Sequence, residues 1–362
     1  LAYVDSSKRF KLDTDYFDFS PGALFPFTPK FIEKFGPPAP PSDHYASTLP
    51  SDLDLGPNRE LQRYANIASS AQQCLTQSIL KLIESHSRST KTPLLYSGGV
   101  ALNSKSNFEI WAKYDLRIPA DPGDGGSSIG AGAALVHHIY GAYPVLSTPY
   151  LGFNVQDEDI ERILKDRALT YTKSSSAHEL VAIASELLAQ RKIIGWAQGR
   201  SEFGPRALGN RSILANPSDI EVRDHINKAV KFRETFRPFA PAICRDDLEE
   251  LFHTRKSKII SDNDPLYFML VTLPAKDKAK KLLPACVHID DTSRVQIVSE
   301  QSNPLFYDLI QEFKRKTGIP ALLNTSFNVK GEPIVDNTED VINTFRKTAL
   351  DAVCVDNFIV RR

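Results

Sequence analysis

Apolar residues recur with two different periods along this chain, and the changes of period indicate where helices and strands lie. Between about 59 and 86 they recur every three or four positions, which predicts one long amphipathic helix. Its apolar positions are Leu61, Tyr64, Ala68, Ala71, Leu75, Ile79 and Leu82. Farther on, short apolar runs predict strands at 192–198, 266–273, 320–324 and 351–360. Helical patterns predict helices at 156–165, 177–190, 246–253, 303–316 and 338–347. Strands and helices thus follow one another throughout, which is typical of an α/β protein.

Two features divide the chain. Residues 36–57 are rich in proline and serine and predict a loop or connector. Ser176 and Glu179 predict a capping box ahead of the 177–190 helix. With 362 residues the chain has room for about two domains. We place their boundary near 145–153, which gives a domain at 1–150 and another at 151–362.

Two glycine-rich turns lie in the first half. The segment 93–110, PLLYSGGVALNSKSNFEI, predicts a strand, a turn at Gly98 and Gly99, and a helix. Backbone N–H groups and the helix dipole favour an anion at such a turn. A second cluster, DPGDGGSSIGAGAAL at 121–135, also leads into a helix. The pair suggests the nucleotide-binding half of the actin and sugar-kinase superfamily, an RNase H-like core. Asn103 and Asn107 share one helix face and could bind nucleotide or cap neighbouring loops.

The block GRSEFGPRALGNRSILANP at 199–217 is the strongest chemical signal. It places three arginines among residues that break regular structure: Gly199, Arg200, Gly204, Pro205, Arg206, Gly209 and Arg211. A guanidinium matches phosphate or carboxylate oxygens two at a time, and glycines let the backbone approach a ligand. A basic surface loop would need charge but not this spacing. We therefore predict an anion site here.

Three further segments carry polar groups of the same kind. The segment NKAVKFRETFRPFAP at 227–241 interleaves cations and aromatics: Lys228, Lys231, Phe232, Arg233, Phe236, Arg237 and Phe239. The segment HIDDTSRVQIV at 288–298 predicts a strand with one polar face, made of His288, Asp290, Thr292, Arg294 and Gln296. That face is either solvated or, beside the arginines, a wall of the site. The segment LNTSFN at 323–328 contains Asn324, Thr325, Ser326 and Asn328. These side chains would either bind substrate or stabilise a turn.

Charge and cysteine content narrow the class of protein. Lys and Arg number 44 and so do Asp and Glu, so the balance points to neither nucleic acid nor a membrane surface. The positive charge is local, between Arg200 and Arg237, as expected of an anion site on a neutral protein. Cys74, Cys244, Cys286 and Cys354 lack metal-ligand spacing and predict reduced thiols in the cytoplasm. No apolar run reaches the roughly 18 residues that span a bilayer.

From about residue 15 to its end, the chain resembles the O-carbamoyltransferases of nodulation-factor and antibiotic biosynthesis. The resemblance rests on five blocks: PYLGFNVQDEDIERIL, GWAQGRSEFGPRALGNRSILANP, KFRETFRPFAPAI, HIDDTSRVQIV and LLNTSFNVKGEPIVDNTEDVINTF. It implies a partial RNase H-like carbamoyl-transfer domain at 1–150 and a YrdC-like domain at 151–362, with 320–362 able to pack back on the first. The chain also starts without Met and corresponds to about the last two thirds of the family members, so an N-terminal lobe or subunit is expected to be missing.

The resemblance also implies an activity and its residues. Carbamoyl phosphate and ATP would give carbamoyl-adenylate, and the carbamoyl group would pass to a hydroxyl of a small natural-product or sugar acceptor. Catalytic roles fall to Arg206, Lys231, Arg237 and Arg294. Binding roles fall to Gly98, Gly99, Asn103, Gly199, Arg200, Arg211, His288, Asn324, Ser326 and Asn328, with Arg200, Arg211 and Arg233 either bracing the loop or touching ligand. Asp124 would bind a divalent metal, expected to be iron, with two histidines of the missing lobe; Mg²⁺ would accompany ATP. The family often has two aspartates where this chain has Asp124-Gly125.

Two other classes of protein, and assembly into a homodimer, remain open at this point. A related enzyme would make threonylcarbamoyl groups for tRNA, but it would need a basic face that the neutral charge does not favour. A non-catalytic or half-enzyme subunit would lack the histidine pair for transfer while keeping the activation residues. A homodimer is compatible with either.

Overall fold

The computed structural model describes residues 2–4, 10–21, 26–38, 59–87, 89, 92–144, 146, 148–155, 160–233, 237–254 and 264–362. The predicted connector at 36–57 lies mostly outside these residues, and so does Phe236. The chain divides into two compact units, one formed by Leu1–Pro93 with Glu109–Asp115 and the other by Leu94–Phe108 with Leu116–Arg362. The domain boundary near residue 150 stays a prediction.

The first unit contains a hairpin and two helices. β1 (Ala2–Val4) pairs antiparallel with β2 (Phe10–Leu12), and α1 (Pro29–Phe35) follows with Pro29 in its first turn. α2 (Arg59–His86) confirms the predicted long amphipathic helix. Arg63 of α2 donates to the main-chain carbonyls of Phe35 and Pro37, the latter at 3.1 Å. This arginine therefore ties α2 to the end of α1 within the unit.

The second unit is built on a mixed sheet, which within the described residues has eight strands in the order β11-β8-β12-β7-β6-β13-β14-β5. The strands are β5 (Tyr171–Lys173), β6 (Ile194–Ala197), β7 (Arg211–Ala215), β8 (Ala240–Cys244), β11 (Gln296–Val298), β12 (Ala321–Ser326), β13 (Ala352–Val355) and β14 (Phe358–Arg361). Every residue of β6, β7, β8, β11 and β13 is buried, so these strands form the centre of the core. The α/β class is confirmed.

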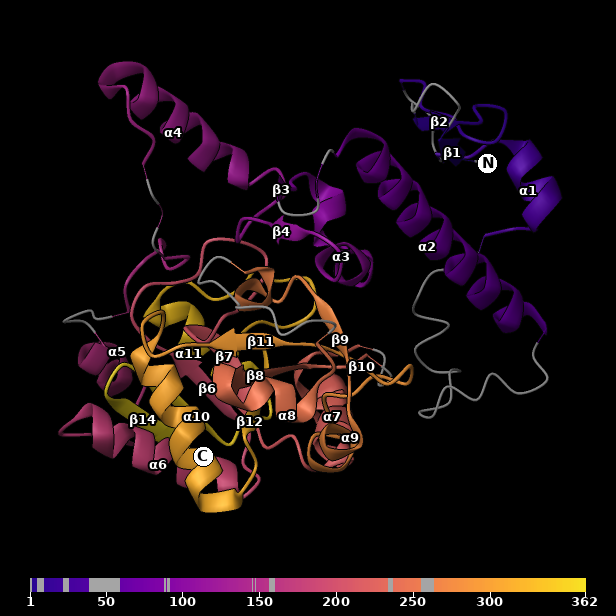
Figure 1. Cartoon of the computed structure of the whole chain (residues 1–362). Helices are drawn as coiled ribbons and strands as arrows, with labels where there is room; N and C mark the ends of the chain where they lie inside the picture. The colour runs from indigo at the N-terminus through magenta and orange to yellow at the C-terminus, as the bar shows by residue number, and fades with distance from the viewer. Residues whose placement is uncertain are drawn as a thin grey trace. The chain divides into compact units, whose positions relative to one another are not determined.

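The helices of this unit begin and end where their sequence signals lie. α6 (Ala177–Ala189) begins at Ser176, whose hydroxyl accepts from Glu179 N at 3.2 Å. α10 (Pro304–Thr317) begins at Asn303 and ends at the left-handed Gly318, and α11 (Thr338–Lys347) begins with a capping box of Asn337 and Asp340. α10 packs against α6 and the sheet (Figure 1). The remaining helices are α5 (Ile160–Asp166), α7 (Ile220–His225), α8 (Leu248–Leu251) and α9 (Asp277–Leu282).

Three sequence predictions need correction. The expected strand 351–360 is a hairpin, because Asp356 adopts a left-handed φ of 48° between β13 and β14. Within 266–273, Pro265–Phe268 forms a 3₁₀ turn that ends at left-handed Met269, and the strand β9 is Thr272–Pro274. In the capping box of α6, Glu179 reaches back to Ser175 rather than to Ser176.

The glycine turns have the predicted local structure. β3 (Pro93–Leu95) leads through a 3₁₀ turn at Gly99–Leu102 into α3 (Ser104–Trp111), and β4 (Asp115–Arg117) leads to α4 (Gly126–Tyr140). Asn107 is fully buried and donates to the carbonyls of Ala101 and Leu270 at 2.7 and 2.8 Å. Among the residues that the structure describes, no helix is long and apolar enough to cross a membrane.

Candidate functional site: a cluster of cations

Four segments lie at one end of the sheet. The loop 198–210 joins β6 to β7, residues 231–233 and 237–239 come before β8, Arg294 ends the strand β10 (Thr292–Arg294) just before β11, and Ser326 ends β12 with 327–328 following it. The sheet register explains this, because Asn324 pairs with both Ala240 and Leu214, and Ser326 pairs with Ser212. The ends of β7, β8 and β12 that carry these loops are therefore adjacent. The arginine block and LNTSFN, about 115 residues apart, become neighbours.

Lys231, Ser326 and Asn328, three of the predicted site residues, are in direct contact. Lys231 follows a π-helical turn at Ile226–Val230 and is 5% exposed. Its ammonium donates to Ser326 Oγ at 3.1 Å, to Asn328 Oδ1 at 2.7 Å and to the main-chain carbonyls of both residues. All of these acceptors are neutral. Burial first, and then the charge of Arg233, lowers the pKa of Lys231 to about 7.

Arg206 and Arg294 lie close to each other and share the same lack of acidic partners. The Nε–H groups of both are buried and donate no hydrogen bond within the described part of the chain. Burial lowers the pKa of Arg294, and the charges of Arg206 and Arg233 lower it further. Burial also lowers the pKa of Arg206. Such guanidiniums stay charged, and a bound anion would supply the partner that they lack among the described residues.

Arg233 connects these groups. It is half-buried, its Nε donates to Asn227 Oδ1 at 2.8 Å, and its guanidinium lies 4.9 Å from the centre of the Phe239 ring. Because its charge affects both Lys231 and Arg294, the four side chains act on one region. We call Arg206, Lys231, Arg233 and Arg294 the cation cluster. No ion pair joins Arg206, Lys231 or Arg294 to a carboxylate among the described residues.

Asn324 lies on the floor of this region. It is 1% exposed, and its Nδ2 donates to Gln296 Oε1 at 2.7 Å and to the Ala207 carbonyl at 3.3 Å. Gln296 in turn donates to the Leu208 carbonyl at 2.7 Å. The Asn324 Oδ1 atom is buried and without a partner. Asn324 thus fixes the loop beside Arg206 and leaves one acceptor unused.

Arg211 braces the loop, one of the two roles that the sequence left open for it. It is fully buried and makes six hydrogen bonds to the main-chain carbonyls of Phe153, Gln198, Gly199, Asn210 and Asp336, at 2.9–3.1 Å. Its five N–H groups are thereby all used. Arg200, which is exposed, donates to the Leu151 carbonyl at 2.7 Å. Both arginines brace the loop through carbonyls, whereas the sequence suggested salt bridges.

Glu202 is the residue that the sequence analysis missed. Its Oε1 accepts the main-chain N–H groups of Leu208, Asn210 and Arg211 at 2.6, 2.7 and 3.2 Å, and its Oε2 is buried without a partner. Burial raises its pKa despite these hydrogen bonds. The carboxylate therefore holds the second half of the loop that carries Arg206. The signal in the sequence was that Glu202 is the acidic residue in the arginine block at 199–217.

The role of Glu202 gives a first prediction. Glu202→Ala is expected to lower the free energy of unfolding by about 2–3 kcal/mol, because three buried N–H groups lose their acceptor. Glu202→Gln keeps an acceptor oxygen and should cost less than about 1 kcal/mol. Because the folded-state pKa is raised, stability falls as pH rises above about 4.5, and Glu202→Gln should flatten that slope. Urea unfolding of both variants at several pH values measures this; equal losses in both would contradict it.

The remaining predicted residues do not join the cluster. The expected strand face of 288–298 is wrong at its start, because left-handed Asp291 closes a turn and only β10 (Thr292–Arg294) and β11 are strands. His288 contacts Asp290 at 3.1 Å, and Asp290 also accepts from Lys105 at 2.7 Å. Arg237 is exposed, and its main-chain carbonyl accepts from Asn227. Gly199 has a positive φ of 48° at the start of the loop.

At the glycine turns, main-chain groups rather than side chains are accessible to a ligand. Gly98 and Gly99 are exposed, and a Cβ added at either would meet nothing within 4 Å, so the turn is open to a ligand. Asn103 accepts the Ser106 N–H at 3.1 Å and thereby caps α3. The Ala120 carbonyl lies 2.9 Å from where a Cβ at Gly204 would stand. The second glycine turn is thus packed against the arginine loop.

Asp124 does not by itself fit the predicted metal. It is exposed, and its main-chain carbonyl accepts from Ser127. Within the described ranges no group of three or more His, Cys, Asp or Glu residues could hold a metal ion. Iron needs several such ligands. No step below is therefore assigned to a metal.

Comparison with known proteins adds a family to this geometry. Residues 185–362, which include the whole cation cluster, match the family described as Carbamoyltransferase C-terminus. The chain is 34% identical over 307 residues to nodulation protein NolO of Bradyrhizobium diazoefficiens, covering 83% of this chain and 55% of that protein. It is 33% identical over 284 residues to nodulation protein U of Sinorhizobium fredii, covering 78% and 48%. The chain thus spans about half the length of these relatives.

A solved structure gives a weaker comparison. Sua5 of P. abyssi, complexed with L-threonine, is 16% identical and superposes with a TM-score of 0.35 over 50% of this chain and 48% of that one. This likeness is too low to assign a fold.

Proposed function

The chain belongs to the carbamoyltransferase family through residues 185–362, and we propose that it is an ATP-dependent O-carbamoyltransferase that activates carbamoyl phosphate at the cation cluster. The observation that carries this proposal is that Arg206, Lys231 and Arg294 lie close to one another and form no ion pair with a carboxylate among the described residues, with Arg233 beside them. Carbamoyl phosphate and ATP together bring several negative charges, which repel one another strongly unless cations lie between them. Arg206, Lys231, Arg233 and Arg294 supply these cations.

The proposed activation step balances as follows. Water takes the phosphoryl group of carbamoyl phosphate, which gives carbamate and inorganic phosphate. A carbamate oxygen then attacks the α-phosphorus of ATP, and pyrophosphate leaves with the electron pair of the broken P–O bond. The product is carbamoyl-adenylate. Arg206 and Arg294 would stabilise the leaving pyrophosphate, while Lys231, held by Ser326 and Asn328, would orient the carbamate.

The second step is carbamoyl transfer to a hydroxyl acceptor. The acceptor oxygen attacks the carbamoyl carbon, AMP leaves, and the acceptor proton passes to solvent or a base. We assign this step to an RNase H-like domain that includes the open turn at Gly98 and Gly99, with residues 151–362 acting as a YrdC-like activation domain. Enclosing both steps in one protein would protect the adenylate from hydrolysis. The acceptor would be a small natural product or sugar.

The test is pyrophosphate release from ATP by the purified chain, with no acceptor present. Release that depends on carbamoyl phosphate is the expected result. Omitting carbamoyl phosphate is the control. Release at the same rate without it would contradict the proposed activation step.

Lys231 adds a pH dependence. Its pKa of about 7 means that its ammonium is lost as pH rises through neutrality. Anion binding at the cation cluster should therefore weaken above about pH 7, by up to about tenfold per pH unit. Sulfate is the suitable probe, because it keeps its charge over this range. Calorimetric titration from pH 6 to 9 should show this slope in the wild type and a weak, pH-independent affinity in Lys231→Met; the same slope in both would remove Lys231 as its origin.

A further inference from the structure

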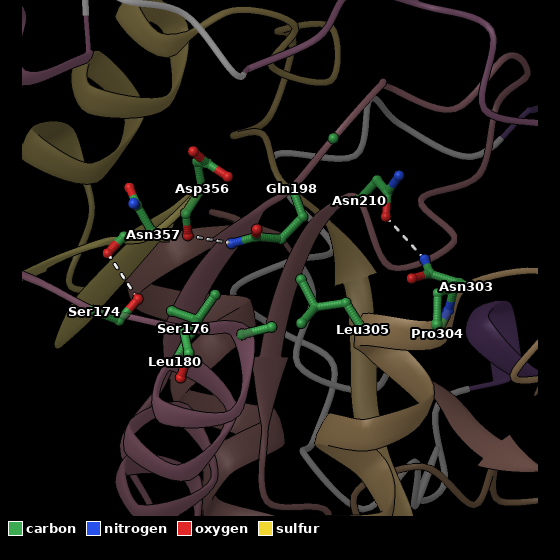
Figure 2. A pocket seen from close by; sticks show the side chains of 12 residues that line it. Ser174, Ser176, Leu180, Gln198, Asn210, Asn303, Pro304, Leu305, Asp356 and Asn357 are labelled. Carbon is green, nitrogen blue, oxygen red and sulfur yellow. Dashed lines mark hydrogen bonds between the residues drawn. The ribbon is translucent and has the colours of Figure 1, made fainter.

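A second cavity lies beside the arginine loop but contains none of the cation cluster. It has a volume of about 340 Å³ and lies among the first turns of α6 and α10 and the carboxyl ends of β6 and β13 (Figure 2). Ligands commonly bind outside the carboxyl ends of parallel strands, and β6 and β13 are a parallel pair. Its residues are Ser174, Ser176, Ala177, Leu180, Gln198, Gly199, Asn210, Asn303, Pro304, Leu305, Asp356 and Asn357.

The wall of this cavity is made of carboxamides that hold one another. Asn303 Nδ2 donates to Asn210 Oδ1 at 2.8 Å, and Asn210 Nδ2 donates to the Arg200 carbonyl at 2.8 Å. Asn303 and Asn210 are each 8% exposed. Ser174 Oγ donates to the Asn357 carbonyl at 3.1 Å. These bonds fix the shape of the cavity before any ligand arrives.

Two acceptors in this wall remain unused. Gln198 is 5% exposed, and its Nε2 donates to the Asp356 carbonyl at 3.0 Å, but its Oε1 has no hydrogen-bond partner among the described residues. Figure 2 shows its side chain between Asp356 and Leu305. Asn357 Oδ1 is buried without a partner. A buried acceptor without a donor is unfavourable, so Asn357 requires an explanation.

The first turns of α6 and α10 also line the cavity. Ser176 Oγ accepts Glu179 N, and Asn303 Oδ1 accepts Phe306 N at 3.2 Å. The N–H groups of Ala177 and Leu305, both in the lining, have no acceptor within their helices. The floor between them is apolar and includes Leu180 and Leu305. Asp356 is the only charged side chain in the lining.

We propose that this pocket binds a neutral, hydroxyl-rich small molecule with a ring of the sugar type. A hydroxyl both donates and accepts, so it satisfies the two amide oxygens and the helix N–H groups together. An anion would leave Gln198 Oε1 and Asn357 Oδ1 without donors and would meet no cationic side chain. A cation would face two helix N-termini. The C–H face of a ring would cover Leu180 and Leu305. The volume is within the range of small-molecule sites.

This site is independent of the proposed reaction. Gln198, Gly199 and Asn210 are the two ends of the arginine loop, whereas Arg206 lies at its middle. A ligand here would contact the base of the loop and leave the cation cluster free. A polyol would therefore bind whether or not the chain activates carbamoyl phosphate.

The experiment is saturation-transfer NMR on the full chain with methyl α-D-glucopyranoside and myo-inositol, followed by titration. The wild type is expected to saturate the signals of at least one polyol with a millimolar Kd. Leu305→Trp fills the cavity and should abolish the transfer. Leu282→Trp, at a half-buried leucine on α9 outside the cavity, is the matched control and should retain it. Gln198→Leu removes the free acceptor and should weaken binding at least tenfold.

The outcomes that overturn the proposal are equally definite. Absence of transfer from both polyols to the folded wild type would refute a sugar-type ligand. Unchanged transfer in Leu305→Trp would place polyol binding elsewhere. A third outcome would show that the pocket binds an anion instead. In that case the wild type binds inorganic phosphate but no polyol, and Leu305→Trp loses the phosphate binding.

Discussion

Replacing Arg294 with alanine is expected to reduce carbamoyl phosphate-dependent pyrophosphate release by about 10²–10³-fold, the usual effect of removing one preorganised group from a developing negative charge. The physical reason is that Arg294 lies beside Arg206 and Arg233, with its Nε buried and no ion pair to a carboxylate among the described residues. Its charge would therefore act on a bound anion. Steady-state kinetics of the activation step measures the loss. Arg294→Lys keeps the positive charge but loses the planar guanidinium, so its rate of pyrophosphate release should lie between those of the wild type and Arg294→Ala.

The unfolding temperature of Arg294→Ala distinguishes a role of Arg294 in ligand binding from a role in stabilising the fold. Arg294 is repelled by Arg206 and Arg233 when no anion is present, so Arg294→Ala should unfold at the same temperature as the ligand-free wild type or a higher one. Arg315, which pairs with Glu312 on the surface of α10 at 2.7 Å, is the control position. Arg315→Ala should change neither rate nor stability appreciably. Full pyrophosphate release in Arg294→Ala would remove this residue from the site.

Replacing Arg211 with methionine is expected to destabilise the fold by more than about 4 kcal/mol, enough to unfold many domains. Five main-chain carbonyls would lose their donor at once, and methionine offers none in return. Arg211→Lys supplies three donors instead of five and should recover part of the loss. Urea unfolding followed by circular dichroism gives the free energies.

Arg191 provides the comparison for that measurement. It is 65% exposed and pairs with Asp219 at 2.9 Å, so Arg191→Met should cost no more than about 1 kcal/mol. A similar small cost for Arg211→Met would show that the carbonyls find other partners, and Arg211 would then be available to a ligand.

Spacing in the sequence predicted an anion site at 199–217, and its chemistry stays a prediction. The structure brings Lys231, Ser326 and Asn328 into contact, which spacing alone did not show. What spacing cannot show is the partner of each charge. Arg211 and Arg294 look alike in the sequence, but Arg211 is surrounded by carbonyls from as far away as Asp336, and Arg294 is not. That difference arises only when the fold brings the carbonyls of Phe153, Gln198 and Asp336 around β7.

The errors in secondary structure have a common cause. Single residues in the left-handed conformation interrupt runs that otherwise predict continuous strands: Asp291 before β10, Asp356 between β13 and β14, and Met269 before β9. Aspartate tolerates this conformation, but it also occurs in ordinary polar strand faces, so its effect cannot be read without the fold. Methionine at such a position gives no sequence signal at all.

The carbonyl cage around Arg211 has a consequence for the speed of ligand capture. Because the loop is held at its base by Arg211 and along its second half by Glu202, the cations above it need no rearrangement before they meet a ligand. Capture is then a diffusional encounter guided by the field of the cation cluster. Such association rates are high and fall steeply with added salt, while dissociation rates change little. Occupancy of the site would therefore follow the ionic strength of its surroundings as well as the concentration of its ligand.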